Sequence, residues 1–174
     1  MRKRFLNLQN FEDDVSLLEN ALSLTDKKNH LLAFKIQGQL FGIEIQFIRE
    51  MTALKLDKPP KAIPNTPDEI LGAVNIRGEI IPVLDIRKKL NLPPKPYVKF
   101  DILMVIETAH QIFGIIIDEA DDMAALPDEK IEGTETEDSK KNPAILFYCT
   151  YKGKIIPILN PQNLFPQADL SRIK

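Results

Sequence analysis

Short stretches of the chain alternate hydrophobic residues with other residues. Every second residue from Phe41 to Phe47 is hydrophobic, which is the period of a strand with one buried face. The apolar segment 32–36 precedes this stretch, and the pair Gln37-Gly38 lies between the two. Because glycine readily adopts the positive φ angle of a tight turn, this order predicts a β-hairpin. The same device occurs twice more, at Arg77-Gly78 and at Lys152-Gly153.

Two of these patterns return later in the chain, in the same order. The run at 40–45, Leu-Phe-Gly-Ile-Glu-Ile, reappears at 112–117 as Ile-Phe-Gly-Ile-Ile-Ile, an offset of 72 residues. The run at 78–85, Gly-Glu-Ile-Ile-Pro-Val-Leu-Asp, reappears at 153–160 as Gly-Lys-Ile-Ile-Pro-Ile-Leu-Asn, an offset of 75 residues. Two matches with nearly the same offset indicate two similar halves of about 70 residues each.

Each half has the pattern of several short strands joined by turns. Pro82 and Pro157 interrupt two of these strands at equivalent positions. Because proline has no N–H to donate, we expect both strands at sheet edges or at bulges. In the second half the apolar runs 103–106 and 112–117 flank a longer loop. The pattern favours a mainly β fold, and a repeat of this length fits two small Greek-key-like barrels lying side by side.

The first 29 residues lie outside the repeat. Phe11, Val15, Leu18 and Leu22 are spaced by four, three and four positions, which predicts the apolar stripe of an amphipathic helix. Asn10 is suited to cap the N-terminus of this helix. Two interpretations stay open, because the helix could pack on its own domain or bind a partner.

The composition excludes several classes of function. The chain has 23 Lys and Arg against 25 Asp and Glu, a formal net charge of −2. It therefore lacks the positive field that drives binding to nucleic acid or to anionic membranes. One Cys (Cys149) and two His (His30 and His110) are too few for a disulfide or a structural zinc site. We expect no metal and no cofactor, and we interpret Cys149 as a small buried hydrophobic residue.

The apolar runs are too short to cross a membrane. The longest, such as 102–106, fall far below the roughly 18 residues that span a bilayer. The basic N-terminus runs into acidic residues without the apolar core of a signal peptide. The sequence thus predicts a cytoplasmic protein with no segment inserted into the membrane.

One acidic cluster invites an enzymatic interpretation. Residues Asp118–Asp122, Asp-Glu-Ala-Asp-Asp, follow the apolar run 115–117, as the magnesium-binding carboxylates of an ATPase follow a buried strand. That chemistry also needs a phosphate-binding loop of the form G-x-x-x-x-G-K-[ST], which the sequence does not contain. The remaining alternative is a nucleotide-hydrolysing enzyme that uses this cluster. Because the sequence lacks the phosphate-binding loop, we predict instead that the protein is not an enzyme.

A longer motif carries a resemblance to a known family. The segment 72–87, Gly-Ala-Val-Asn-Ile-Arg-Gly-Glu-Ile-Ile-Pro-Val-Leu-Asp-Ile-Arg, closely resembles the core motif of the CheW family of bacterial chemotaxis coupling proteins. The likeness covers roughly residues 30–168 and leaves out the N-terminal extension 1–29 and a C-terminal tail 169–174. Further pieces agree in order, namely Phe41-Gly42-Ile43, Ile48–Met51, Ile63–Pro67 and Phe113–Asp118.

The resemblance implies a fold and a function. It implies two intertwined five-stranded SH3-like barrels in a domain at 30–168, with a first half at 30–95 and a second half at 96–168. It also implies a non-enzymatic adaptor that joins the cytoplasmic tips of chemoreceptors to a CheA-type histidine kinase, whose regulatory domain has the same fold. Such an adaptor is cytoplasmic and is recruited to receptor arrays. The long N-terminal extension suggests a scaffold of a twitching or phototaxis pathway as an alternative, and a detached kinase regulatory domain is another protein of the same fold.

The resemblance also implies where the receptor binds. Family residues that match Ile48, Glu50, Gly72, Ile76 and Arg77 lie near the groove that grips the receptor helix hairpin, and the glutamate and arginine interact. The second half departs from the family at Tyr148–Gly153 and at Asn160-Pro161. The resemblance therefore leaves the surface that faces the kinase open.

Overall fold

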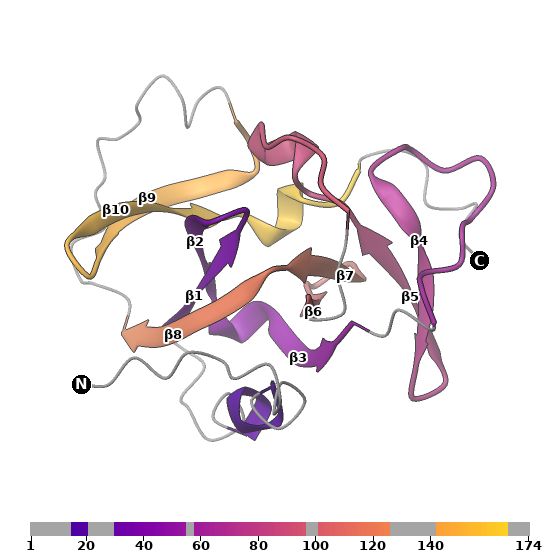
Figure 1. Ribbon diagram of the computed structural model, residues 1–174, viewed down its shortest axis with the longest axis horizontal. Helices are drawn as coiled ribbons and strands as arrows, with labels where there is room; N and C mark the ends of the chain where they lie inside the picture. The colour runs from indigo at the N-terminus through magenta and orange to yellow at the C-terminus, as the bar shows by residue number, and fades with distance from the viewer. Residues whose placement is uncertain (1–14, 21–29, 55–57, 97–100, 126–141, 167–174) are drawn as a thin grey trace.

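The computed structural model describes residues 15–20, 30–54, 58–96, 101–125 and 142–166, and the chain within them is mainly β (Figure 1). No helix in these ranges is long and apolar enough to cross a membrane. The elements in chain order are β1 (His30–Ile36), β2 (Gln39–Glu44), η1 (Ile45–Phe47), β3 (Ile48–Ala53), β4 (Ile70–Ile76), β5 (Glu79–Leu84), η2 (Lys88–Leu90), β6 (Ile102–Glu107), β7 (Ile112–Ile117), β8 (Glu119–Ala125), β9 (Ile145–Tyr151), β10 (Lys154–Leu159) and η3 (Pro161–Asn163).

All three X-Gly pairs form the predicted hairpins. They join β1 to β2, β4 to β5 and β9 to β10, and each pair of strands is antiparallel. Both residues of each turn have a positive φ angle, for example 52° at Arg77 and 89° at Gly78. Two positive φ angles in a two-residue loop match the right-handed twist of the strands. The loop between β6 and β7 is longer, as predicted, and the backbone N–H of Thr108 donates to the carbonyl of Gln111 there.

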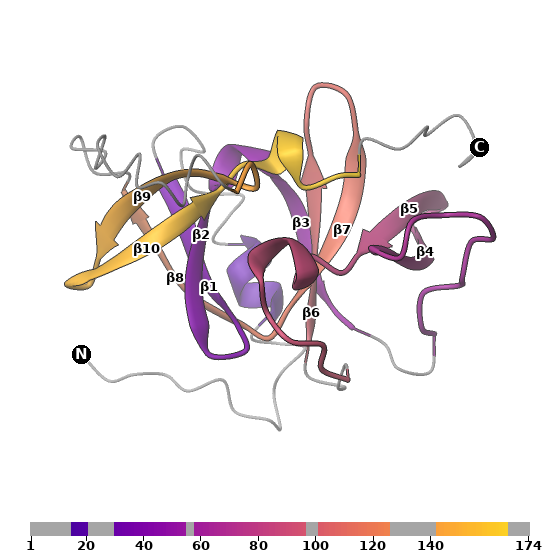
Figure 2. The same cartoon turned by 90° about the horizontal axis from the view of Figure 1, so that it is seen from above.

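The two halves exchange strands. One sheet has the order β8-β1-β2-β10-β9 and the other β3-β6-β7-β5-β4. Replacing each strand by its counterpart in the other half, β1 by β6 and so on, converts the first order into the second. Figures 1 and 2 show the two sheets meeting at the middle of the molecule. The expected intertwined pair of five-stranded units is confirmed, and neither half builds a barrel on its own.

Short parallel pairings join the halves inside each sheet. Ile158 of β10 pairs with Gly42 of β2, and Val83 of β5 pairs with Gly114 of β7. The glycine of each repeated Phe-Gly-Ile motif therefore lies where strands of different halves meet. A Cβ atom at Gly42 would crowd the Ile158 side chain, and one at Gly114 would crowd the side chain of Leu103. Gly42 therefore allows the close approach of β10 to β2, whereas the side chain nearest to Gly114 belongs to β6 of the same half.

Of the two placements expected for the prolines, the sheet edge is wrong, whereas a register shift of the bulge type lies within two residues of each proline. Pro82 lies in β5 and Pro157 in β10, and each strand has a neighbour on both sides, so neither is an edge strand. The parallel pairing of β5 with β7 begins at Val83, and that of β10 with β2 is at Ile158. Each proline thus precedes the stretch in which its strand gains a second neighbour. On the side of this second neighbour the missing N–H of proline costs no hydrogen bond, because the neighbouring strand does not yet pair at the proline.

Buried side chains form three clusters within the described part of the chain. Leu31 and Ala33 of β1 face a small cluster within the first sheet. Leu32, Phe34 and Ile36 of the same strand face the largest cluster, which strands of both sheets share. A third cluster lies within the second sheet and includes Val83 and Leu103. Both faces of β1 are therefore buried, which explains its nearly continuous apolar sequence.

The N-terminal extension packs on the domain where the structure describes it. Residues 15–20 are helical. Val15 is 3% exposed and belongs to the shared cluster, and Leu18 packs against that cluster. The interpretation in which the helix packs on its own domain is thereby confirmed for these residues. Asn10, Phe11 and Leu22 lie outside the described residues.

Candidate functional site

Side chains join the two edges of the second sheet. β3 and β4 are the edge strands of that sheet, yet Glu50 of β3 reaches Arg77 in the turn after β4, with 3.3 Å between Oε2 and Nη2. The next residue of β3, Arg49, reaches Glu79 at the start of β5 over 2.8 Å. The sheet must therefore curl until its edges approach each other. We call Arg49, Glu50, Arg77 and Glu79 the first corner.

The two partners of the central ion pair differ in exposure. The side chain of Glu50 is 12% exposed, whereas that of Arg77 is 79% exposed. The carboxylate is therefore held inside the corner while the guanidinium points outward. A guanidinium has five N–H donors and accommodates more than one carboxylate. Glu19 of the N-terminal helix also lies 3.8 Å from Arg77 Nη2, so two carboxylates share this cation.

Arg49 reinforces the same corner from the other side of β3. Besides its contact with Glu79, its Nε lies 3.8 Å from Glu107 at the end of β6. The hydrogen bond to Glu79 raises the pKa of Arg49 above its ordinary value. Arg49, Glu79 and Glu19 were not among the site residues expected from the sequence. Arg49 adjoins Glu50, and alternation along β3 sends adjacent side chains to opposite faces, so no local pattern indicated a second contact there.

The other expected site residues occupy different surroundings. Ile48 is 2% exposed and belongs to the shared cluster, so in the free protein it is covered and supports β3 from inside. Ile76 is partly buried, next to Arg77, and packs on the cluster within the second sheet. The structure thus brings Glu50, Ile76 and Arg77 together and directs Ile48 inward.

Gly72 has a structural reason to be glycine. Its φ angle is +148°, and a Cβ atom there would collide with the backbone carbonyl of Lys61. Lys61 forms an isolated bridge to Ala73, in which the two residues exchange backbone hydrogen bonds. Gly72 therefore lets the segment at Lys61 lie against β4.

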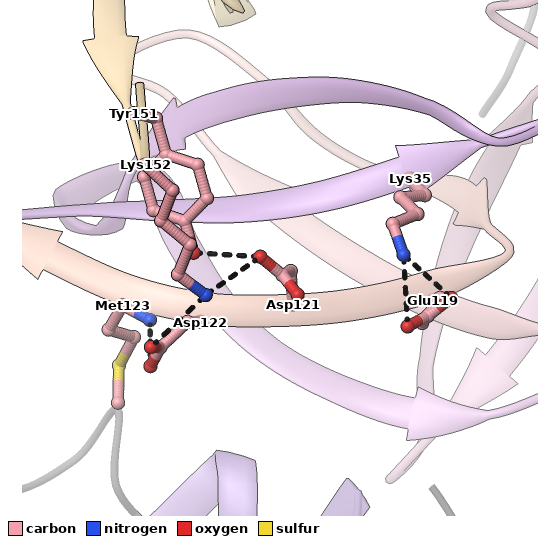
Figure 3. Close-up of polar contacts among 7 residues, drawn as sticks. All are labelled: Lys35, Glu119, Asp121, Asp122, Met123, Tyr151 and Lys152. Atoms are coloured by element: carbon pink, nitrogen blue, oxygen red, sulfur yellow. Dashed lines mark hydrogen bonds and ion pairs between the residues drawn. The ribbon is translucent and has the colours of Figure 1, made fainter. Parts of the chain in front are cut away.

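The second half repeats this arrangement with other residues. Met51 pairs with Met104 across β3 and β6, and Met123 pairs with Leu32 across β8 and β1. Because Leu32 and Met104 are repeat counterparts, Asp122 holds the position of Glu50. Lys152 likewise holds the turn position of Arg77. We call Asp121, Asp122, Tyr151 and Lys152 the second corner (Figure 3).

The second corner is bonded within itself. Tyr151 is 5% exposed, and its hydroxyl donates to Asp121 Oδ2 over 2.8 Å. Lys152 Nζ donates to the same oxygen over 3.2 Å and lies 3.6 Å from Asp122. The ammonium also lies 5.0 Å from the centre of the Tyr151 ring. These contacts join β8 to β9, the edge strands of the first sheet.

Burial and hydrogen bonding shift the titration of the second corner. Burial raises the pKa of Tyr151 to about 12. Burial alone would also raise the pKa of Asp121, but the hydrogen bonds from Tyr151 and Lys152 outweigh it and lower this pKa. The pKa of Lys152 is raised, mainly by its hydrogen bond with Tyr151. At neutral pH the corner therefore contains a neutral phenol, an ionised Asp121 and a charged Lys152.

The acidic cluster 118–122 does not converge on a common site. Asp118 accepts a hydrogen bond from the backbone N–H of Gln37 over 2.7 Å, and Glu119 pairs with Lys35 at 3.3 Å. Asp121 and Asp122 belong to the second corner. Among the described residues no group of three or more His, Cys, Asp or Glu could hold a metal ion. These contacts give the alternative of an enzyme at this cluster no support.

The single cysteine occupies the environment that the sequence predicted. Cys149 is fully buried in the cluster within the first sheet. Burial raises the pKa of its thiol above the ordinary value. A nucleophilic cysteine instead requires a lowered pKa and access to solvent. Cys149 therefore acts as a small hydrophobic residue.

The chain matches one protein family over most of its length. Residues 30–169 match the family model described as a CheW-like domain. A protein named as a probable chemotaxis protein CheW from Rhizobium etli is 29% identical over 112 residues, which cover 64% of this chain and 70% of that protein. The chemotaxis protein CheW of Rhizobium meliloti is 23% identical over 151 residues, or 86% of this chain and 95% of that protein.

A solved structure has a similar fold. The crystal structure of the scaffolding protein TtCheW from Thermoanaerobacter tengcongensis superposes with a TM-score of 0.70 and 24% sequence identity. The superposition covers 80% of this chain and 89% of that one. The likeness shows that the two chains share a fold.

Proposed function

The chain belongs to the CheW family of chemotaxis scaffold and adaptor proteins, and from this premise we propose that it couples chemoreceptors to a CheA-type histidine kinase. The match to the CheW-like domain over residues 30–169 is the observation that carries this proposal. Under this proposal the protein is not an enzyme, resides in the cytoplasm and is recruited to membrane-bound receptor arrays. Its partners are the cytoplasmic tip of a chemoreceptor and the regulatory domain of the kinase.

The first corner is the proposed contact with the receptor. The exposed guanidinium of Arg77 is held in place by Glu50, whose carboxylate lies inside the corner. An oriented arginine beside a partly buried apolar residue, Ile76, is suited to the rim of a helix-binding groove. Glu50 and Ile48 then act by holding β3 and Arg77 in place, and Gly72 acts by letting the backbone at Lys61 approach β4.

Electrostatics set the expected strength of this contact. In the free protein the Arg77 side of its pair with Glu50 is open to water, with 79% of the Arg77 side chain exposed, so the pair adds only about 0–1 kcal/mol to stability. A receptor helix that covers Arg77 would remove this water. Truncation of one partner of a covered ion pair costs about 2–5 kcal/mol of binding. Arg77 should therefore matter far more for receptor binding than for folding.

Arg77→Ala tests the receptor contact. The variant should bind the cytoplasmic tip fragments of chemoreceptors from the same genome at least about tenfold more weakly, while its melting curve stays nearly unchanged. Lys152→Ala is the matched control, because Lys152 holds the same turn position in the other half, and this variant should retain receptor binding. Equal binding by wild type and Arg77→Ala would overturn the assignment of the corner.

Co-sedimentation tests the adaptor function as a whole. The full chain is mixed with the receptor tip fragment, with the kinase regulatory domain, and with both together. The proposal expects binding to each and a complex of all three. Binding to neither would overturn the proposed function and leave the fold untouched.

A further inference from the structure

The N-terminal helix lies against the corner proposed for the receptor. In Figure 1 the helical residues 15–20 lie below β3 and β8, and in Figure 2 they project between the strands of one sheet and those of the other. Val15 and Leu18 pack with the shared cluster, which includes Ile48 and Met51 of β3. Glu19, the next residue along, lies 3.8 Å from Arg77. The helix thus contacts both the shared cluster and the exposed cation.

The contacts of this helix have the pattern of a partner helix in a groove. Two apolar residues three positions apart face the protein, as in helix-in-groove recognition. Leu17 points away from it and is 55% exposed. Glu19, the residue after Leu18, lies near Arg77, which already pairs with the carboxylate of Glu50. Glu50 belongs to the sheet and is 12% exposed, whereas the side chain of Glu19 is 36% exposed, so Glu19 is the carboxylate that a partner can replace.

We propose that residues 15–20 occupy part of the receptor-binding surface in the free protein, and that a receptor helix displaces them. The inference rests on the proposed function, because it concerns the same corner. It also specifies the partner, whose helix presents two apolar residues three positions apart and a carboxylate that takes the place of Glu19 on Arg77. The N-terminal helix then lowers the affinity for receptors by the fraction of time that it is docked.

Two variants of the full chain, each of which adds one negative charge, distinguish the release of the helix from an effect of charge alone. Val15→Asp places a charge in the shared cluster and releases the helix, whereas Leu17→Asp adds the same charge on its exposed face. Val15→Asp should bind receptor tip fragments at least about threefold more tightly than wild type, and Leu17→Asp should bind like wild type. Glu19→Gln, which keeps the apolar contacts, should give a smaller increase in affinity.

Hydrogen exchange measures the displacement directly in the wild-type chain. Peptides that contain residues 15–20 should exchange faster when a saturating receptor tip fragment is added. This measurement does not depend on whether the Val15→Asp variant folds.

The possible results distinguish this inference from the proposed function. If Arg77→Ala weakens receptor binding but release of the helix leaves it unchanged or weakens it, the displacement is wrong and the receptor site stands. Unchanged or slower exchange of residues 15–20 on binding leads to the same conclusion. If the wild-type chain binds no receptor tip, the proposed function fails and this inference fails with it.

Discussion

The two corners share a backbone frame and differ in what closes them. Each places an X-Gly turn with two positive φ angles against the far edge strand of its sheet. At the first corner the cation is 79% exposed and its acidic partner is largely covered. At the second corner a buried tyrosine and a lysine both donate to Asp121. The first corner therefore leaves its cation more accessible, whereas in the second corner the lysine, still 58% exposed, shares one carboxylate with a buried phenol.

This difference shows that equivalent sites in the two halves of a duplicated fold can take different roles. The side-chain contacts of both corners hold two sheet edges together, which is a structural task. Both corners present a cation to solvent, but the side chain of Arg77 is 79% exposed and that of Lys152 is 58% exposed. The second corner contributes to stability, so substitutions there should change unfolding, whereas loss of the exposed Arg77 should change binding.

The largest expected effect comes from a residue that only the first half has. Gly72 pairs with Val83, and Phe147 pairs with Ile158 at the equivalent position of the second half. Gly72→Ala should lower the free energy of unfolding by about 3 kcal/mol, because it adds a collision with the Lys61 carbonyl to the strain of a positive φ angle. Urea unfolding measures this loss.

Gly78→Ala is the control for the Gly72 substitution. Gly78 also has a positive φ angle, +89°, but a Cβ atom there meets nothing within 4 Å. The control should lose only about 1 kcal/mol. Equal losses in the two variants would show that the approach of Lys61 to β4 is not what requires glycine.

The second corner should weaken at high pH. Because burial raises the pKa of Tyr151 from about 10 to about 12, the folded state keeps the phenol proton after the unfolded state has lost it. This contribution to stability is complete below pH 10 and disappears as the pH rises to about 12, a loss of about 2 kcal/mol. Urea unfolding across this range measures it.

Tyr151→Phe isolates that effect from other groups that titrate at high pH. The variant has no phenol proton, so its stability should fall less between pH 10 and pH 12 than that of the wild type. A constant difference between the two proteins across the range would contradict a raised pKa for Tyr151.

The smallest expected effects compare the two equivalent acids. Glu50→Gln should cost about 1 kcal/mol of stability, because its carboxylate is mostly covered and forms an ion pair with Arg77. Asp122→Asn should change stability by less than about 0.5 kcal/mol, because Asp122 is 61% exposed and Lys152 keeps its ion pair with Asp121. Thermal unfolding of the two variants, side by side, measures the difference. A larger loss for Asp122→Asn would reverse the ranking of the corners.

Local patterns predicted much of this fold. The turns at Gln37, Arg77 and Lys152 follow from one glycine each, because a two-residue hairpin loop depends on its own φ angles. The pairing of Glu50 with Arg77 was expected from the family resemblance and is present. The strand order could not be read from the residues alone, since Gly42 meets Ile158 only through contacts between distant segments. The edge position expected for Pro82 was wrong for the same reason.

The second corner was within reach of the sequence and was missed. The offset of 72 that relates the Phe-Gly-Ile motifs also carries Glu50 to Asp122, and the offset of 75 carries Arg77 to Lys152. The bond between Tyr151 and Asp121 has no counterpart in the first half, where Ile76 holds the position of the tyrosine. The contact of Glu19 with Arg77 depends on where the helix packs, which no local pattern specifies.

The exchange of strands ties the folding of this protein to its synthesis. On the ribosome β1 and β2 emerge long before β8, β9 and β10, which complete their sheet. Lys35, for example, can bond to Glu119 only after 84 further residues have been synthesised. Until then the nascent first half exposes unpaired strand edges, which are sites of aggregation. A chain released after the first half would therefore yield no folded unit, and chaperones should engage this protein until translation of its last strands.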